Sequence, residues 1–329
     1  MNQILLDILS ITPNAPTLEE QMRNYILKVC KKHKIPCHTD KYNNVWVNAT
    51  ESNLYTDTKM LFTAHLDHPG IVINKIDNKH GLMQATWLGG KPAKHIEGYK
   101  VRLFLPDGEG YIDDAEAQII RIDGKSLTIA FFSKVPLHHL PMGATLDLDT
   151  VESQGIISTR SADDLISVSA IIEAIIKNKH NIPKDLTVLF SHSEEIGLRG
   201  VRKDVIAPKL ISKDCDVCVF DVTRSAKPVT KEGTGLIMRT GDDETNYPCT
   251  VNSIVKASGI LPVKSKKTKG ATEATAFVKG GFPKVASVAI AIYAEHNKES
   301  DTGFNVLPES FAVKDYEKLV NFISFMMKY

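Results

Sequence analysis

The stretch LTVLFSHSEEIGLRG, residues 186–200, joins a short apolar run to an acidic turn. The run at 186–191 is short and rich in β-branched and aromatic side chains, which is typical of a buried strand rather than a helix. Polar residues and glycine then follow, and a short helix is expected after Gly200. A buried strand that leads through a polar loop into a helix is the repeating unit of an α/β sheet.

The same alternation continues on both sides of this stretch. Strands are expected at 44–48, 59–64, 217–221 and 285–294, and helices at 18–33, 165–178, 246–258, 272–279 and 313–327. Alternating strands and helices predict an α/β fold, with a mixed sheet that carries helices on both faces.

Residues 71–157 have a different pattern. Short apolar or alternating runs such as GLMQATWL, YKVRLFLP and KSLTIAFF are separated by Gly, Pro and Asp-Gly, and none of them has helical spacing. Many short, closely spaced strands indicate a small all-β barrel-like domain. We therefore predict a discontinuous α/β domain formed by residues 1–70 and 158–329, with an inserted β-rich domain at 71–157 that serves oligomerisation or substrate access.

Composition excludes several classes of protein. Forty basic and 39 acidic residues give a net charge of +1, so bulk charge attracts the chain neither to nucleic acid nor to an anionic membrane. The apolar run at 285–294 is about half of the ~20 residues that span a bilayer. The first ten residues lack the basic and apolar regions of a secretory signal. Five cysteines indicate free thiols in a reducing compartment, so we expect a cytoplasmic protein.

Residues able to bind metal follow several of the predicted strands. Because ligands bind at the carboxyl ends of strands in open α/β sheets, these side chains are expected to meet. A further acidic pair precedes the helix expected at 165–178. The candidates are His65, Asp67, Asp163, Asp164, Glu194, Glu195, Asp221 and His296.

The residue types suit a pair of divalent ions. Two histidines and three carboxylates form a ligand set for zinc, with cobalt and manganese as alternatives. Two such ions share a bridging carboxylate and a nucleophilic water. The extra carboxylate in the Glu194-Glu195 pair can then act as general base. Asp67, two residues after His65, can accept the second imidazole N–H and orient the ring.

The order of the motifs resembles a known family. HLDHPG, SADDL, SEEIGLRG, FDVT and the late His296 are similar to the motifs of the tetrahedral (TET), glutamyl and deblocking aminopeptidases, a family of dinuclear zinc metallopeptidases. The similarity extends along the chain to GATEATAFVKGGFP. Members of this family also carry a β-barrel-like insertion between the His-x-Asp and Asp-Asp motifs.

The resemblance assigns roles to individual residues. His65 and Asp221 would bind one metal, Glu195 and His296 the other, and Asp163 would bridge both. Glu194 would be the general base for a water held between the two metals. The resemblance also implies peptide substrates and a homo-oligomer built from dimers, with a dodecamer as one form.

Three departures from the family pattern bear on specificity. His68-Pro69-Gly70 follows His-x-Asp where the family has Glu-Ile-Gly, and Leu165 follows Asp-Asp where the family has Arg. His296 lacks the usual His-Ser-Pro-x-Glu context. His192 and His68 are therefore alternative candidates for the last ligand.

The leading hypothesis is a metal-dependent aminopeptidase that removes N-terminal residues from short peptides. A related metal-dependent deacylase or carboxypeptidase is a second enzymatic hypothesis. A catalytically silent homologue that acts as a binding or assembly module is the third, although Glu194 and every proposed ligand are present.

Overall fold

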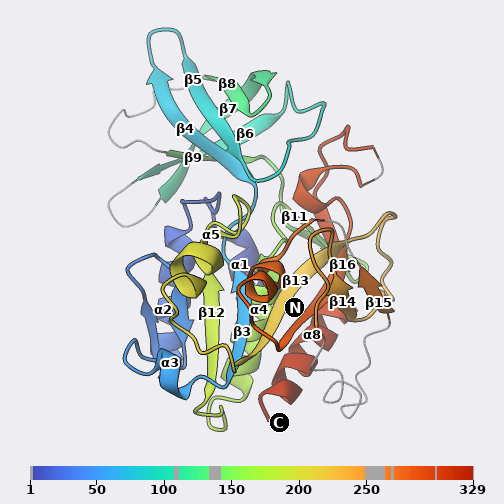
Figure 1. Cartoon of the computed structure of the whole chain (residues 1–329). Helices are drawn as coiled ribbons and strands as arrows, with labels where there is room; N and C mark the ends of the chain where they lie inside the picture. Colours follow the sequence, from blue (N-terminus) through green and yellow to red (C-terminus); the bar gives the residue numbers. More distant parts are fainter. Residues whose placement is uncertain are drawn as a thin grey trace.

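An eight-stranded mixed sheet forms the centre of the molecule in the computed structural model, which describes residues 3–106, 111–132, 142–248, 264–267, 270–300 and 302–328 (Figure 1). The three central pairs, β12 with β3, β3 with β13 and β13 with β16, are parallel, whereas β2 and β14 run antiparallel to their central neighbours. In spatial order the strands are β1 (Cys37–Thr39), β2 (Val45–Val47), β12 (Leu186–Ser191), β3 (Met60–His65), β13 (Asp216–Arg224), β16 (Val285–Ile292), β14 (Ile237–Gly241) and β15 (Lys264–Lys267).

Helices cover both faces of this sheet, as predicted. Alternate residues of β3 separate the two cores, because Phe62 packs in the larger apolar cluster and Leu61 in the smaller one. The larger cluster contains residues of α1 (Gln3–Ser10), α2 (Glu20–His33), α4 (Leu165–Lys177) and α8 (Val313–Met326). The smaller cluster contains residues of α3 (Leu54–Asp57), α5 (Arg199–Val201), the π-helix η1 (Arg202–Ile206) and α7 (Glu273–Lys279).

The helix α4 lies deep in the protein. Every residue from Leu165 to Ile175 is buried, because α4 packs against the sheet and against α1 and α8. This burial explains why an apolar residue at position 165 is stable there. The helix predicted at 246–258 falls mostly on residues 249–263, which lie outside the described residues.

Six antiparallel strands close into a barrel beside the sheet, which confirms the predicted barrel-like domain (Figure 1). Alternate residues of β5 and β8 are buried, and their apolar side chains fill the interior around Trp87 and Ile129. The strands are β4 (Gly70–Asp77), β5 (Leu82–Leu88), β6 (Lys100–Pro106), β7 (Tyr111–Asp123), β8 (Ser126–Phe131) and β9 (Met142–Leu146).

After the barrel the chain enters a small three-stranded sheet. β10 (Val151–Ser153) pairs with β11 (Ile156–Thr159), and β11 pairs with β17 (Glu309–Ala312), which leads directly into α8. This pairing brings a segment just before Asp163 next to the carboxyl-terminal part of the chain. The domain limits at 71 and 157 stay a prediction.

No helix in the described ranges has both the length and the apolar composition needed to cross a membrane.

Candidate metal centre

Six of the predicted site residues line one cavity of about 500 Å³ at the carboxyl edge of the central parallel strands. His65 is the last residue of β3, Asp221 lies within β13, and the two glutamates follow β12. Asp163 lies just before α4, and His296 lies in the short 3₁₀ turn η2 (Glu295–Asn297) after β16. Since β12, β3, β13 and β16 are consecutive neighbours, their carboxyl ends gather these side chains, as expected for an α/β sheet. The six residues are His65, Asp163, Glu194, Glu195, Asp221 and His296.

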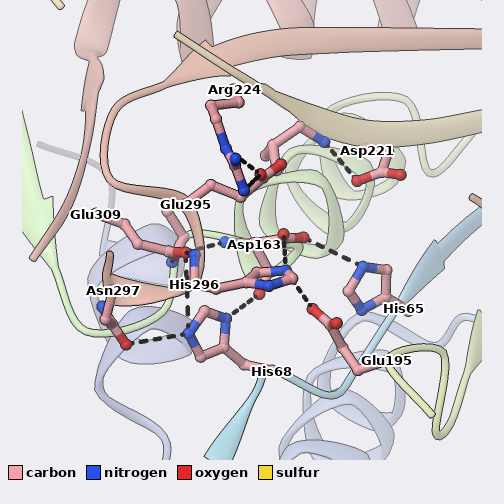
Figure 2. A network of polar contacts seen from close by, with 12 residues as sticks. His65, His68, Asp163, Glu195, Asp221, Arg224, Glu295, His296, Asn297 and Glu309 are labelled. Carbon is pink, nitrogen blue, oxygen red and sulfur yellow. Dashed lines mark hydrogen bonds and ion pairs between the residues drawn. The ribbon is translucent and has the colours of Figure 1, made fainter. Parts of the chain in front are cut away.

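Asp163 lies between the two histidines. Its Oδ1 is 3.2 Å from Nε2 of His65, and its Oδ2 is 3.3 Å from Nε2 of His296 (Figure 2). The two oxygens of one carboxylate thus face two different imidazoles, which is the arrangement of a bridging ligand.

The candidate ligands form three overlapping groups. In one group, Nε2 of His296 is 3.0 Å from Oε1 of Glu195, and both lie with Asp163 close enough to hold one ion. In a second group, His65 and Asp221 lie with Asp164, and in a third group His65 lies with Glu194 and Glu195. Both side-chain oxygens of Asp164 are buried and lack a hydrogen-bond partner within the described ranges. Asp164 therefore lies with His65 and Asp221, in the second group.

Asp67 is fully buried and supports the site in two ways. Its backbone carbonyl oxygen is 2.9 Å from Nδ1 of His65, whereas its carboxylate oxygen is 3.7 Å away. The carboxylate instead accepts hydrogen bonds from the backbone N–H groups of Glu194 and Glu195, at 2.8 and 3.1 Å. The imidazole is thus held by the main chain of Asp67, and the carboxylate holds the acidic turn.

The alternative histidines occupy other positions. His192 lies 2.9 Å from a carboxylate oxygen of Asp204 and does not line the cavity. His68 is fully buried and lies behind Asp163, where its Nδ1 donates to the backbone carbonyl of Asp163 at 2.7 Å. Its ring meets that of His296 edge to face (Figure 2).

Two buried residues near the ligands are absent from the sequence-based site. Arg239 on β14 donates to Oδ2 of Asp221 at 3.2 Å, and Glu309 at the start of β17 accepts backbone hydrogen bonds from the segments of Asp163 and His296. Arg239 carried a signal, since an arginine in the apolar run GLIMRTG requires a buried partner. Glu309 lies 13 residues after His296, beyond any local pattern.

The electrostatics of the cluster follow from burying several carboxylates and imidazoles together. Burial raises the pKa of Glu194 well above its ordinary value, and it raises the pKa of Asp221 to about 6. Burial alone would lower the pKa of His65 and His296, but the neighbouring carboxylates raise both well above the usual value. For Asp163, burial is outweighed by the two histidines, which hold its pKa below the ordinary range.

The fold of this chain is similar to that of several solved structures. Two solved structures match nearly the whole chain: PhTET1-12s, a dodecamer, with 24% identity, 99% of each chain covered and a TM-score of 0.79, and Pyrococcus horikoshii TET1 peptidase, with 21% identity, 98% of each chain covered and a TM-score of 0.78. An aminopeptidase from Desulfurococcus kamchatkensis matches at 15% identity over 99% of this chain and 94% of its own, with a TM-score of 0.78.

The family follows from the sequence match. The pattern of the M42 glutamyl aminopeptidase family matches residues 144–304, and over these residues the chain belongs to that family of peptidases. The resemblance predicted from the motifs is therefore confirmed. None of the curated proteins matches the chain.

Proposed function

We propose that this protein is a metal-dependent aminopeptidase that hydrolyses the first peptide bond of short peptides. The observation that carries the proposal is the position of Asp163, whose carboxylate lies between His65 and His296 in a cavity that also contains Glu194. A carboxylate between two imidazoles, with a further carboxylate free for proton transfer, suits hydrolysis assisted by two metals.

The residues fit a pair of divalent ions, zinc first, with cobalt or manganese as alternatives. His65 and Asp221 would hold one ion, Glu195 and His296 the other, and Asp163 would bridge them. Two features of this chain support that fit. Oδ1 of Asp163 is buried against the imidazole of His65, and both oxygens of Asp164 are buried without a hydrogen-bond partner among the described residues. Buried carboxylates in such excess need cations to remain ionised.

When bound, the two ions would supply Lewis-acid activation of a water and of the scissile carbonyl group. Glu194 would act as general base, taking a proton from the attacking water at its carboxylate and passing it to the leaving amine. Its backbone is fixed by the carboxylate of Asp67, so its side chain starts from a rigid position.

The cavity favours an aminopeptidase over a carboxypeptidase. A carboxypeptidase needs a free cation for the terminal carboxylate of its substrate. Both arginines that line the cavity already have carboxylate partners, because Arg224 pairs with Glu295 at 2.8 Å and Arg239 pairs with Asp221 at 3.2 Å.

The proposal extends to the setting of the enzyme. We infer a cytoplasmic homo-oligomer built from dimers, for which a dodecamer is one form, with no nucleic-acid or membrane partner. The inserted domain at 71–157 would serve assembly and substrate access to the α/β domain of residues 1–70 and 158–329. The similar structures support the assembly, since one is a dodecamer and another is described as assembling into a tetrahedron or a large octahedral shell.

The proposal is tested with aminoacyl-p-nitroanilides and their N-acetylated counterparts. We expect cleavage of the free amines only, loss of activity with a chelator, and recovery with zinc, cobalt or manganese. Glu194→Gln should keep both ions and lose about 10²- to 10⁴-fold in kcat, whereas the exposed Glu152→Gln should match the wild type.

The alternatives predict different outcomes. Equal cleavage of the acetylated substrates would identify a deacylase instead. Two bound ions without cleavage of any substrate in a broad panel would favour a silent homologue.

A further inference from the structure

A single buried carboxylate connects two ligand-bearing segments of the candidate metal centre. Glu309 is fully buried at the start of β17. Its Oε2 accepts hydrogen bonds from the backbone N–H groups of Ala162 and Asp163, at 2.5 and 3.0 Å. Its Oε1 accepts the backbone N–H of His296 at 2.6 Å (Figure 2). One side chain thus satisfies three buried donors that belong to segments far apart in the sequence.

Both segments need such an acceptor, because neither is part of a sheet or a long helix at the ligand. Asp163 precedes the first residue of α4, and His296 lies in a tight turn with a φ of 59°. A non-glycine residue rarely adopts this left-handed backbone unless its surroundings hold it there. The hydrogen bond from the His296 N–H to Glu309 is one contact that holds the turn in place.

A second set of contacts holds the other sides of the same two segments. Nδ1 of His68 donates to the backbone carbonyl of Asp163, so the N–H and the C=O of Asp163 both have fixed partners. The side-chain amide of Asn297 donates to the backbone carbonyl of Arg160 at 2.8 Å. These contacts leave the Asp163 and His296 side chains oriented toward each other and toward Glu195.

The contrast with His65 and Asp221 shows why this support is specific. Those two residues lie within paired strands of the sheet, because His65 on β3 pairs with Ser191 of β12 and Asp221 on β13 pairs with Ala289 of β16. We propose that Glu309 is a positioning residue for the second ion, that is, the ion held by Asp163, Glu195 and His296. The role of Glu309 rests on the proposed function, since it requires that the protein bind two ions.

The proposal is tested by measuring the dissociation constants of the first and the second zinc ion in competition with a chelating dye. The visible spectrum of the cobalt-loaded protein is the second measurement. His296→Ala, which removes a ligand of the second ion, assigns the two binding steps. In Glu309→Ala the Kd of the second ion should rise about 10- to 100-fold, the range for loss of a residue that orients ligands. The Kd of the first ion should change little, and the cobalt spectrum of the second ion should be altered even at saturation.

Two variants separate positioning from a general loss of stability. Glu173→Gln alters another buried, hydrogen-bonded carboxylate, on α4 and away from the cavity, and should leave both constants and the spectrum unchanged. Glu309→Gln keeps the size of the side chain and one acceptor oxygen, so its second-ion Kd should lie between those of the wild type and Glu309→Ala. If Glu309→Ala does not fold, the comparison of Glu309→Gln with the wild type tests the proposal.

The outcomes are distinct. Wild-type affinity and spectrum for the second ion in the Glu309 variants, or an equal loss at both sites, would overturn the positioning role while leaving the proposed function intact. A wild-type protein that binds no second ion would contradict the proposed function and this inference together.

Discussion

The two halves of the candidate metal centre are built in different ways. His65 and Asp221 stand on adjacent strands of the central sheet, whereas Glu195 and His296 stand on loops that follow strands. In the first half, the sheet ladder fixes the backbone and a charged neighbour, Arg239, contacts the ligand. In the second half, buried carboxylates hold the backbone itself: Asp67 holds Glu195, and Glu309 holds His296. Where a ligand lies outside a strand or helix, side chains remote in sequence are thus needed to hold its backbone.

The largest effects are expected from removing one ligand of each half. His65→Ala and His296→Ala should each bind one ion in place of two. Each should lose about 10³-fold or more in kcat, because a metal supplies several kcal/mol of charge stabilisation in the transition state. Metal analysis of the dialysed proteins and steady-state kinetics measure both quantities. If either variant retains two tightly bound ions, the division into halves is wrong.

A second prediction concerns Arg239 in the first half. Arg239→Gln leaves the buried Asp221 without its cationic partner, so the free energy of unfolding of the metal-free protein should fall by about 3 kcal/mol. Saturating zinc should reduce this loss, since a bound cation supplies a new partner for Asp221. Urea denaturation with chelator and with zinc compares the two states. An equal loss in both would show that Arg239 stabilises the fold without regard to the ion.

A third prediction concerns Gly90, which follows the barrel strand β5 and lies next to His296 of the second half. A Cβ atom at Gly90 would lie 3.1 Å from Nδ1 of His296. Gly90→Ala should therefore displace the imidazole slightly and raise the Kd of the second ion about fivefold, equivalent to roughly 1 kcal/mol of side-chain strain. Competition with a chelating dye measures the Kd of the second ion, and the Kd of the first ion is the internal control. A matching change in the first ion would mean that the barrel affects the whole cavity.

The smallest effect is expected at Glu273, a residue of α7 outside the cavity lining, and it concerns the pH dependence of stability. Glu273 accepts hydrogen bonds from the hydroxyl groups of Thr63 and Ser191. Burial raises the pKa of Glu273 in the folded protein. A raised carboxyl pKa stabilises the fold below the unfolded pKa of about 4.5, and this contribution is lost as the pH rises through the folded pKa. Wild-type stability should therefore fall relative to Glu273→Gln as the pH increases.

Thermal unfolding of the metal-free proteins between pH 5 and pH 8 measures this difference, which we expect to be about 2–4 °C at most. A constant difference across that range would show that Glu273 does not change its protonation there.

Much of the fold could be predicted because its signals are local. The apolar runs at β3, β12 and β16 are short and lead directly into segments that contain His, Asp or Glu. The same short stretches of sequence therefore indicate both the strands and the site residues. The closed barrel follows from many short alternating runs. The helix α1 was missed, because eight residues with Leu5, Ile8 and Leu9 buried make a pattern too short to distinguish from a loop.

The supporting residues of the site could not be predicted in the same way. Glu309 acts on backbone N–H groups, and its position depends on the pairing of β17 with β11, about 150 residues away in the chain. Backbone donors leave no side-chain pattern to recognise. Asp67 shows a related limit. Its position two residues after His65 made it a candidate from the sequence, but the partners of its carboxylate, the N–H groups of Glu194 and Glu195, lie on another loop.

The closure of the barrel has a consequence for assembly. Because every barrel strand pairs on both sides, the barrel offers, over the residues that the structure describes, no free edge to which another subunit could add a strand. Subunit contacts through the barrel would therefore depend on side chains and loops, which vary easily between relatives. Assemblies of different size can then arise from one barrel scaffold without a change at the carboxyl edge of the large sheet.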